Sequence, residues 1–436
     1  MKKYLPTLIL GLLALAAVAG LFIYLDTRPE TTVGDSQSEE HLLAMELSND
    51  GSYYIITGIG SLEETDIIIP SEYKGVPVKE IGQWAFRYNS EINSVTIPDT
   101  VEIIRESAFS HTSISEIIIP NSVTALEGYV FSGCQNLEKA VLPENIVEIG
   151  ENLFSECSKL KDVNIPKSIV SIPANCFSQC ISLKNISLPD GIQTLGNSAF
   201  MNCNALESIN LPDSLKIISD SCFWGSRLAE VNLPSGLEEI GGMAFEDCPI
   251  KSVSLPKGLK KLGNRAFGRT EISSVEIPAS VTEIGANPYS GCKNLTRITV
   301  SNENPVYYSQ NNCIISKDDY SLISFTSIDD IPNDGSIKVI GMYAYSDIDA
   351  DTVIIPEGVK VIKSSAIVNF DNIGEIVLPK SLELIEEGAI SAVNYHNESV
   401  KKITYCGTSE QWHSMNRAEK WLSSADNVLI IDIGAK

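Results

Sequence analysis

Histidine is scarce in this chain, and the few histidines present stand apart from other reactive residues. The 436 residues include four of them, His41, His111, His396 and His413. None belongs to a His-Glu-x-x-His pair or a Cys-x-x-Cys cluster, and the sequence has no Gly-x-Ser-x-Gly elbow and no glycine-rich phosphate loop. We therefore predict no catalytic residues, no metal site and no cofactor, and we expect that the protein is not an enzyme.

Two weaker groupings have ordinary structural explanations. Cys406 and His413 lie seven residues apart, and we interpret this spacing as packing rather than as a nucleophile pair. Asp347-x-Asp349-x-Asp351 has the alternating carboxylates of a calcium loop but lacks the glycine and the later glutamate that such a loop requires. We interpret it as an acidic turn.

Basic residues are few relative to acidic ones. Lysine and arginine together number 32 against 56 aspartates and glutamates, which gives a formal net charge of -24 and a pI near 4.6. Because a phosphate backbone is bound by a basic surface, we expect no nucleic acid and no anionic lipid headgroup as a partner. The acidic surface favours solubility, and attraction to a basic partner is the alternative.

One long apolar run stands near the N-terminus. Lys2 and Lys3 precede an uncharged run of 21 residues, Leu5 to Leu25, which is long enough to span a bilayer. We expect an uncleaved signal anchor that meets the membrane as a transmembrane helix through Leu5 to Leu25. The alternative is a signal peptide cleaved near Ala17-Val18-Ala19. The positive-inside rule then places the rest of the chain outside the cell, either membrane-bound or secreted.

Twelve prolines end the same short apolar phrase, for the most part 22 or 23 residues apart. One example is Ser208-Ile209-Asn210-Leu211-Pro212. Residues one and three before the proline are apolar and the alternate ones are mostly polar, which indicates a strand with one buried face. Proline ends the strand because it has no N–H for a further ladder bond. The prolines are Pro70, Pro98, Pro120, Pro143, Pro166, Pro189, Pro212, Pro234, Pro256, Pro278, Pro356 and Pro379.

A large apolar residue recurs eleven positions after these prolines, starting with Pro98, and five positions after an Ile or Leu that commonly precedes glycine, as in Ile149-Gly150. A unit this short cannot enclose its own apolar face, so successive units must stack as coils, with parallel strand pairing at about 4.8 Å per coil. The sequence therefore predicts a repeat solenoid with an aromatic ladder inside it. The ladder residues are Phe86, Phe109, Phe131, Phe154, Phe177, Phe200, Phe223, Phe245, Phe267, Tyr289 and Tyr345, followed by Ile367 and Ile390.

The unit, approximately IxIPxxVxxIGxxAFxxCxxL, resembles the BspA-like leucine-rich repeats of bacterial surface proteins. The resemblance extends from about Leu43 to the C-terminus. It implies a leucine-rich-repeat solenoid with one parallel β-strand per 22–23-residue coil. Because members of this family bind varied partners, it implies adhesion to, or interaction with, proteins or glycans outside the cell rather than one particular ligand.

Atypical segments flank and interrupt the repeats. Asn49-Asp50-Gly51 suits the turn of an N-terminal β-hairpin cap, and Thr408 to Ala418 with Val428 to Ile433 are expected to form a C-terminal helix and strand cap. Around Asn302-Glu303-Asn304-Pro305 a hairpin replaces the repeat, and it either projects as a binding loop or continues the stack. The expected organisation is a signal anchor or signal peptide at 1–25, a flexible acidic linker at 26–41, hairpin cap and repeats at 42–300, the insertion at 301–332, repeats at 333–400 and the C-terminal cap at 401–436.

Six of the ten cysteines share one position, three residues after the ladder aromatic. Other coils carry a small polar residue there, such as Thr112 or Ser226, which indicates a buried turn position rather than a disulfide framework. We interpret these cysteines as structural thiols, with bridges between adjacent coils as the alternative. The six are Cys134, Cys157, Cys180, Cys203, Cys248 and Cys292.

Two groups of residues are candidates for binding. Trp224, next to a ladder residue, and Trp84, two before Phe86, are possible anchors unless they lie in the core, because aromatic residues carry much binding energy at interfaces. A row of polar residues faces outward in consecutive coils and suits either a peptide or glycan ligand or plain solvation. It comprises Asn164, Ser187, Asn210, Asn232 and Ser254.

The leading functional hypothesis is a non-catalytic cell-surface protein that binds proteins or host-surface material. The first alternative is a passive structural component of the cell envelope without a specific ligand. The second is a hydrolase with its site in the insertion at residues 301–332.

Overall fold

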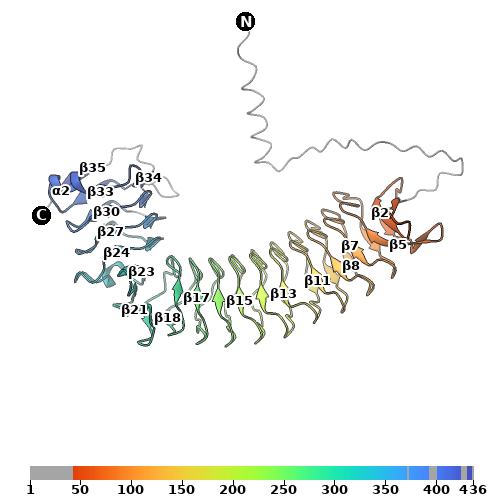
Figure 1. The fold of residues 1–436 in the computed structure, drawn as a ribbon, viewed down its shortest axis with the longest axis horizontal. Helices are drawn as coiled ribbons and strands as arrows, with labels where there is room; N and C mark the ends of the chain where they lie inside the picture. The colour runs from red at the N-terminus through yellow and green to blue at the C-terminus, as the bar shows by residue number, and fades with distance from the viewer. Residues whose placement is uncertain (1–42, 371–372, 392–399, 424–429, 435–436) are drawn as a thin grey trace, which may run out of the picture. The chain divides into compact units, whose positions relative to one another are not determined.

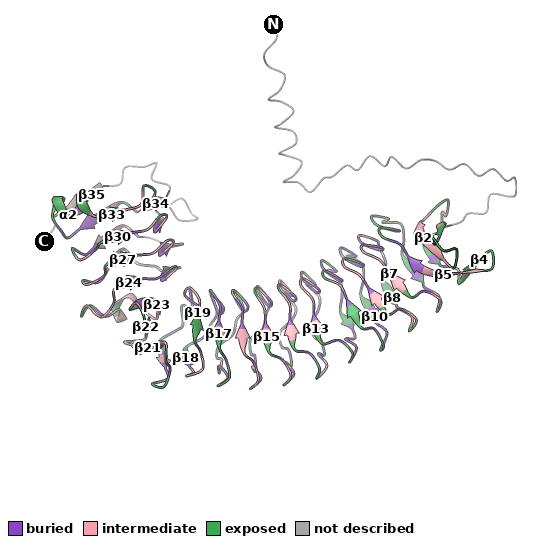
Figure 2. Cartoon of the chain, viewed as in Figure 1, coloured by how far each residue is buried: buried purple, intermediate pink, exposed green. Residues whose placement is uncertain are grey.

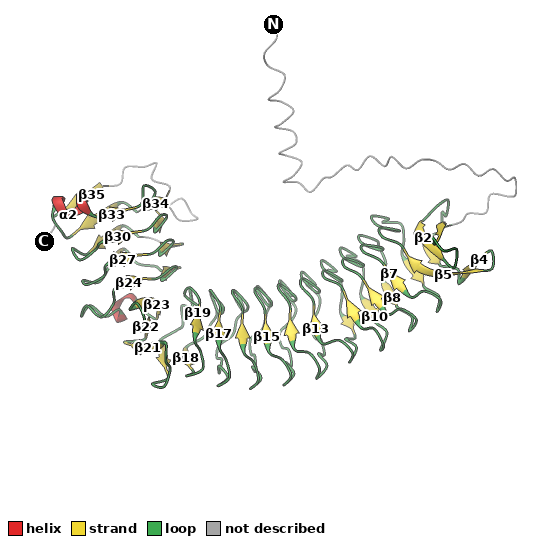
Figure 3. Ribbon diagram, in the orientation of Figure 1, coloured by secondary structure: helices red, strands yellow, loops and turns green. Residues whose placement is uncertain are grey.

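The computed structural model describes residues 43–370, 373–391, 400–423 and 430–434. They belong to one compact unit, Leu42–Lys436. Successive coils of short strands and turns follow one another along the chain, with very little helix (Figures 1 and 3). This confirms the predicted solenoid of parallel strands. The predicted anchor, Leu5 to Leu25, and the predicted linker at residues 26–41 lie outside the described residues.

The first strand of most coils leads to the repeat proline, and these strands pair in parallel with their neighbours. Inward residues such as Ile117 and Ile119 are buried while Ile118 between them is exposed, an alternation that Figure 2 shows along the coils. We call this set the proline row. Its strands are β3 (Asp66–Ile68), β6 (Ser94–Thr96), β8 (Glu116–Ile118), β10 (Lys139–Val141), β12 (Asp162–Val163), β18 (Ser274–Ile277), β20 (Arg297–Val300), β26 (Thr352–Ile354), β29 (Glu375–Leu378), β32 (Lys402–Tyr405) and β35 (Ile430–Ile433).

The second strand of each coil precedes the position that is often glycine. Glycine suits this position where coils approach closely, because a Cβ on Gly150 would lie 2.3 Å from the backbone nitrogen of Gly128. We call these strands the glycine row. They are β5 (Val76–Ile81), β7 (Ile103–Ile104), β9 (Ala125–Leu126), β11 (Glu148–Ile149), β13 (Ser171–Ile172), β14 (Thr194–Leu195), β15 (Ile217–Ile218), β16 (Glu239–Ile240), β17 (Lys261–Leu262), β19 (Glu283–Ile284), β24 (Val339–Ile340), β27 (Val361–Ile362), β30 (Leu384–Ile385) and β33 (Asn416–Arg417).

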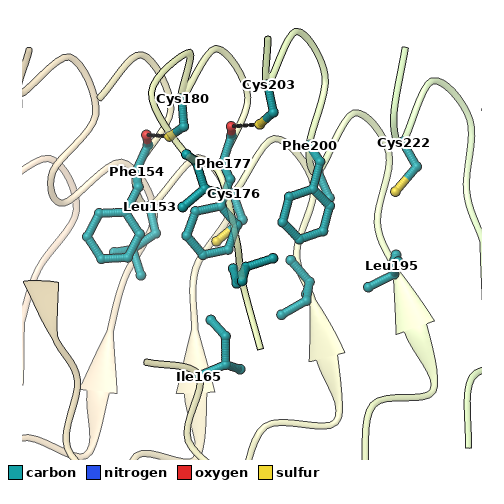
Figure 4. Packing of buried hydrophobic residues seen from close by; sticks show 14 of the residues in the cluster. Leu153, Phe154, Ile165, Cys176, Phe177, Cys180, Leu195, Phe200, Cys203 and Cys222 are labelled. Carbon is teal, nitrogen blue, oxygen red and sulfur yellow. Dashed lines mark hydrogen bonds between the residues drawn. The ribbon is translucent and has the colours of Figure 1, made fainter. Parts of the chain in front are cut away.

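The ladder rings stack inside the coils from Phe86 to Tyr289, with centroids 5.2 to 6.0 Å apart and interplanar angles of 3° to 16°. The phenylalanine rings are at most 1% exposed, and Figure 4 shows three of them in register. Four C-terminal coils have short paired strands at this position. They are β25 (Tyr345–Ser346), β28 (Ile367–Val368), β31 (Ile390–Ser391) and β34 (Leu422–Ser423).

The backbone around each ladder residue, which we call the ladder turn, is unusual. Residues two before and two after the ladder position have positive φ, as at Ser107 (56°) and His111 (58°) around Phe109. This conformation directs alternate N–H groups at the next coil, so that the N–H of Phe109 donates to the carbonyl of Val130 at 3.0 Å. Hydrogen bonds between neighbouring coils therefore continue through the turn.

The cysteine thiols bind the preceding coil. Cys180 Sγ donates to the carbonyl oxygen of Phe154, and Cys203 Sγ donates to that of Phe177, both at 3.1 Å (Figure 4). All ten cysteines are free and nine of them are buried. Burial raises the pKa of the Cys203 thiol to about 12. These cysteines are structural thiols in the folded chain.

The insertion continues the glycine row instead of projecting from it. β21 (Tyr307–Gln310), β22 (Cys313–Ser316) and β23 (Ser321–Phe325) form an antiparallel meander, and β23 then pairs in parallel with β24. A short 3-10 helix, η1 (Ile328–Asp330), follows β23.

On the ladder side, the coil of Tyr289 meets the coil of Tyr345 directly. Asn287 Nδ2 donates to the carbonyl of Tyr343 at 3.0 Å, and the ring of Phe325, from the insertion, packs edge-on against Tyr345 at 5.1 Å. We call this contact the seam. It interrupts the otherwise uniform stacking of coils.

The ends of the described chain add strands to the rows. β1 (Ala44–Leu47) and β2 (Tyr54–Gly58) form an antiparallel hairpin, β2 pairs in parallel with β5, and β4 (Glu72–Tyr73) pairs antiparallel with the start of β5. At the other end, α2 (Ser409–Ser414) starts after the capping residue Thr408. It stops short of the predicted Ala418 because β33 pairs with β30, so that its backbone groups join the glycine row instead of the helix.

Candidate binding surfaces

The outward row predicted from the sequence is exposed except at its first residue. Asn164 is half-buried because its amide binds the backbone of Leu142, accepting from the N–H at 2.8 Å and donating to the carbonyl at 2.9 Å. Asn164 therefore joins two coils. The remaining residues present small polar side chains to solvent, and their role in binding stays a prediction. They are Ser187, Asn210, Asn232 and Ser254.

Neither of the two predicted anchor tryptophans lies in the core. Trp224 is 37% exposed, and its Nε1 donates to Asp247 of the next coil at 3.0 Å. Trp84 is 52% exposed. Trp224 therefore has a hydrogen-bond partner within the protein, whereas the ring of Trp84 is the more open of the two.

Trp84 belongs to a group of aromatic residues on the ladder turns of the first coils. Tyr88 is 63% exposed and Tyr129 is 43% exposed, and His111 lies on the coil between them. Trp84 and Tyr129 occupy the position two before the ladder residue, whereas Tyr88 and His111 occupy the position two after it. We call these four residues the aromatic face, and within it the rings of Tyr88 and His111 are in contact.

The aromatic face is built in an unfavourable backbone conformation. The φ angles of Trp84, Tyr88 and Tyr129 are 62°, 61° and 61°. The left-handed region costs a bulky L-residue roughly 1–2 kcal/mol and is better tolerated by asparagine or glycine. Other coils carry a mixture of residues there, from Asn152 and Gly225 to Met243 and Arg265. The three large rings are therefore accommodated at a cost in local stability.

A stack of planar groups orders one side of this face. The Arg87 guanidinium lies over the ring of Tyr88 at 4.6 Å and donates to its hydroxyl at 3.1 Å. The Tyr88 ring stacks on the imidazole of His111, with centroids 4.8 Å apart and an interplanar angle of 16°. The imidazole in turn lies over Gly133, where a Cβ would approach its Nδ1 to 2.2 Å. Gly133 is thus the small residue that gives the stack room.

Three serines lie on the same ladder turns. Ser107 takes the position of Trp84 and Tyr129 in the intervening coil, and Ser110 and Ser132 follow ladder residues directly. Ser107 and Ser110 are buried, at 5% and 3% exposed, whereas Ser132 is half-buried. Ser132 is therefore the most accessible of the three hydroxyl groups on the turns that carry the exposed rings.

The seam is a second feature that the sequence did not indicate. Arg265 is 12% exposed at its side chain and binds Glu246 at 2.6 Å and Asp347 at 2.8 Å, while Arg269 binds the other oxygen of Asp347 at 2.8 Å. Burial by itself raises the pKa of the Asp347 carboxyl. The hydrogen bond from Arg269 and the charge of Arg265 lower the pKa by more than burial raises it, so its net shift is downward. Both Asp347 oxygens are thus occupied, which excludes it as an open calcium ligand.

Two open hollows of about 400 and 350 Å³ flank Asp347. The N–H groups of Tyr289 and Gly291, which border them, have no hydrogen-bond partner among the described residues, although the matching N–H of Phe267 donates to the next coil at 2.8 Å. Groups of both charge signs line the hollows, including Lys293 and Asp329. The seam consequently has no clear preference for a ligand of either sign.

The residues weighed for catalysis do not assemble into a site. His413 Nδ1 lies 2.6 Å from the backbone oxygen of Ser409 on its own helix, so its ring is directed at that helix and not at Cys406. Across the described ranges, no three His, Cys, Asp or Glu residues are grouped so that they could hold a metal ion. Across the same ranges, no helix has both the length and the apolar character needed to cross a membrane.

Comparison with solved structures supports the fold. A leucine-rich repeat protein from Bacteroides ovatus ATCC 8483 is 23% identical, with 92% of this chain and 100% of that chain covered and a TM-score of 0.58. A leucine rich cell surface protein from Faecalibacterium prausnitzii A2-165 is 20% identical over 89% of this chain and 98% of that one, with a TM-score of 0.42. No curated protein matches the chain.

The family model for the BspA type leucine rich repeat region matches residues 61–181, 148–268, 216–333 and 314–409. These matches overlap and together span most of the chain, in agreement with the resemblance carried by the repeat unit. The chain belongs to the family of proteins with BspA type leucine rich repeats.

Proposed function

We propose that this protein is a non-catalytic binding protein of the cell surface that holds its partner on the outward side of the coils. One observation supports this proposal above the others: the aromatic face keeps three large rings exposed in a backbone conformation that disfavours them. Strain that the fold does not require is a feature of functional sites. A passive envelope component would have no reason to retain it.

The location follows from the family and from the N-terminal sequence. Proteins with this repeat are typical of the cell surface, and Leu5 to Leu25 would hold the chain in the membrane, with residues 26–41 as a tether. The hairpin of β1 and β2 and the C-terminal elements would cap the coil stack. Partners are proteins or glycans outside the cell, and nucleic acid is not among them because the chain is strongly acidic.

The test compares two variants that change positive-φ positions of the ladder turn. In the first, Trp84, Tyr88 and Tyr129 are all replaced by asparagine; in the second, Met243→Asn alters an exposed residue with φ of 53° in a distant coil. Full-length proteins are immobilised and titrated with extracts of host matrix and of cell envelope. We expect saturable binding that the triple variant loses and Met243→Asn keeps. Equal binding by both variants would exclude the aromatic face, and no saturable partner would favour the passive role.

A further inference from the structure

We propose that the aromatic face binds an extended glycan chain. This inference rests on the proposed function and specifies its ligand class. A sugar ring has an apolar face of C–H groups and an edge of hydroxyl groups, so its binding site needs aromatic surfaces and hydroxyl partners close together. The first coils supply both on the same ladder turns.

The first requirement is an exposed ring surface. Trp84, Tyr88 and Tyr129 are each 43% to 63% exposed, and tyrosine and tryptophan combine a large apolar surface with one polar group. The exposed aliphatic residues of these coils, Ile68 and Ile118, lie on the proline row instead. The exposed apolar surface on the ladder turns therefore consists of aromatic rings. Such a surface suits a ligand that stacks on rings better than a partner that needs a broad aliphatic contact.

The second requirement is spacing. Trp84 and Tyr129 occupy equivalent positions two coils apart, with Ser107 in the coil between. The ladder rings of these coils are 5.2 Å and then 5.6 Å apart. The two exposed rings are therefore separated by roughly 11 Å along the stack, a little more than two strand spacings. This is close to the length of two sugar residues in an extended chain, so alternate sugars can stack on Trp84 and Tyr129.

The third requirement is hydrogen-bonding capacity that is still free. A serine hydroxyl both donates and accepts, as a sugar hydroxyl does, and the half-buried Ser132 is the serine of these turns that a sugar can reach, since Ser107 and Ser110 are buried. Arg87 adds a guanidinium that Tyr88 orients and that no described carboxylate pairs with. This one arginine can bind a carboxylate of an acidic sugar locally, against the overall repulsion of anions by a chain of net charge -24.

The experiment measures binding of three defined hexasaccharides to the full-length protein by calorimetry. Two probes are neutral, a β-linked glucose and a β-linked N-acetylglucosamine hexamer, and the third alternates N-acetylglucosamine with glucuronic acid. We expect saturable binding that weakens roughly tenfold or more in Trp84→Asn and in Tyr129→Asn, equivalent to about 1.4 kcal/mol, and is unchanged in Met243→Asn. Arg87→Gln should weaken the acidic probe selectively.

A second measurement uses the unmodified protein. Its tryptophan fluorescence should change when the bound hexamer is added, because Trp84 contacts the ligand. The same change should persist in the Trp224→Phe variant. If no probe binds, or if the Trp84 and Tyr129 variants bind as the parent does, the glycan assignment is wrong. Should an unglycosylated protein instead bind through the same residues, the glycan class fails while the proposed binding function stands.

Discussion

The aromatic ladder should carry a large share of the stability of the central coils, and Phe200→Ala tests this. The Phe200 ring is fully buried and stacks between Phe177 and Phe223, at 5.4 Å from each. Replacing a buried phenylalanine by alanine removes its transfer free energy and leaves a cavity, which together cost about 3 to 5 kcal/mol. Each stacked neighbour adds about 0.5–1.5 kcal/mol beyond buried area. We therefore expect Phe200→Ala to lower the free energy of unfolding by an amount in the upper half of this range of about 3 to 5 kcal/mol.

Position in the stack provides an internal comparison. Phe86 is also buried but stacks on one ring only, that of Phe109 at 5.2 Å. Phe86→Ala should therefore cost less than Phe200→Ala by roughly one stacking contact, about 1 kcal/mol. Phe200→Leu keeps most of the side-chain volume and should cost less than about 1.5 kcal/mol.

The assay is urea unfolding of the full-length variants, followed by circular dichroism. Because each coil contacts only its neighbours, a solenoid can unfold in parts, so hydrogen exchange at the Phe200 amide, which donates to the Cys222 carbonyl at 2.8 Å, reports the local loss. A loss below about 1 kcal/mol in both measurements would show that the ring contributes no more than an exposed side chain, and would refute the enclosed ladder.

Two further predictions concern ionisable groups in the interior. Burial raises the pKa of Cys203 and Cys248 to about 12. The folded chain therefore keeps these thiol protons at pH 10, while the unfolded chain begins to lose them near pH 9. The contribution of each thiol to the free energy of unfolding is thus fully present below pH 9 and falls by about 1.4 kcal/mol per pH unit above it. The slope between pH 9 and 11 in urea titrations should be shallower in a Cys203→Ala, Cys248→Ala variant, and an unchanged slope would contradict the raised values. At the seam, the net pKa of Asp347 is lowered, so its contribution exists at neutral pH and is lost as the pH falls through the folded pKa. Asp347→Asn should lower the free energy of unfolding by about 3 kcal/mol at pH 7, because it leaves the charge of Arg265 partly uncompensated, and it should make stability less sensitive to acid. Lys360→Gln, which breaks an exposed ion pair, should lower the free energy of unfolding by less than about 1 kcal/mol. Similar losses in both variants would refute a buried cluster of charges at the seam.

The coils and the ladder could be predicted because burial within one coil depends on local residue order. Alternation before each proline fixes which side chains point inward, and Phe109 or Phe200 falls at the same distance from its proline in every unit. The small residue after the ladder position, such as Cys180, likewise follows from comparison of one coil with another. Repetition supplies many independent observations of one environment.

Features that depend on contacts between particular coils could not be predicted from the sequence in the same way. The ion pair between Arg265 and Asp347 joins residues 82 positions apart, and it forms because the insertion adds strands to the glycine row without adding a ladder ring. Asn164 was assigned to an outward row because of its place in the phrase, but its amide is long enough to reach the backbone of Leu142. Tyr88, His111 and Tyr129 were missed, although a signal existed: most other coils carry a residue without an aromatic ring at these positions, such as Asn152, Met243 or Arg265.

These positions show that surface side chains of this solenoid can vary without a change in its core. Positions two before and two after the ladder residue must have positive φ whatever their side chain, because their N–H groups bind the next coil, as Trp84 donates to Glu106 at 3.1 Å. Their side chains point away from the ladder, so exchanging asparagine for tryptophan adds a local conformational cost of roughly 1–2 kcal/mol without opening a cavity. Surface chemistry can therefore change from coil to coil while the stacked rings stay constant. Among the described residues, the tryptophan and tyrosine rings at these positions are Trp84, Tyr88, Tyr129 and Tyr343, and three of the four lie on the first three coils. The fold does not require this concentration, and we therefore assign it to ligand binding.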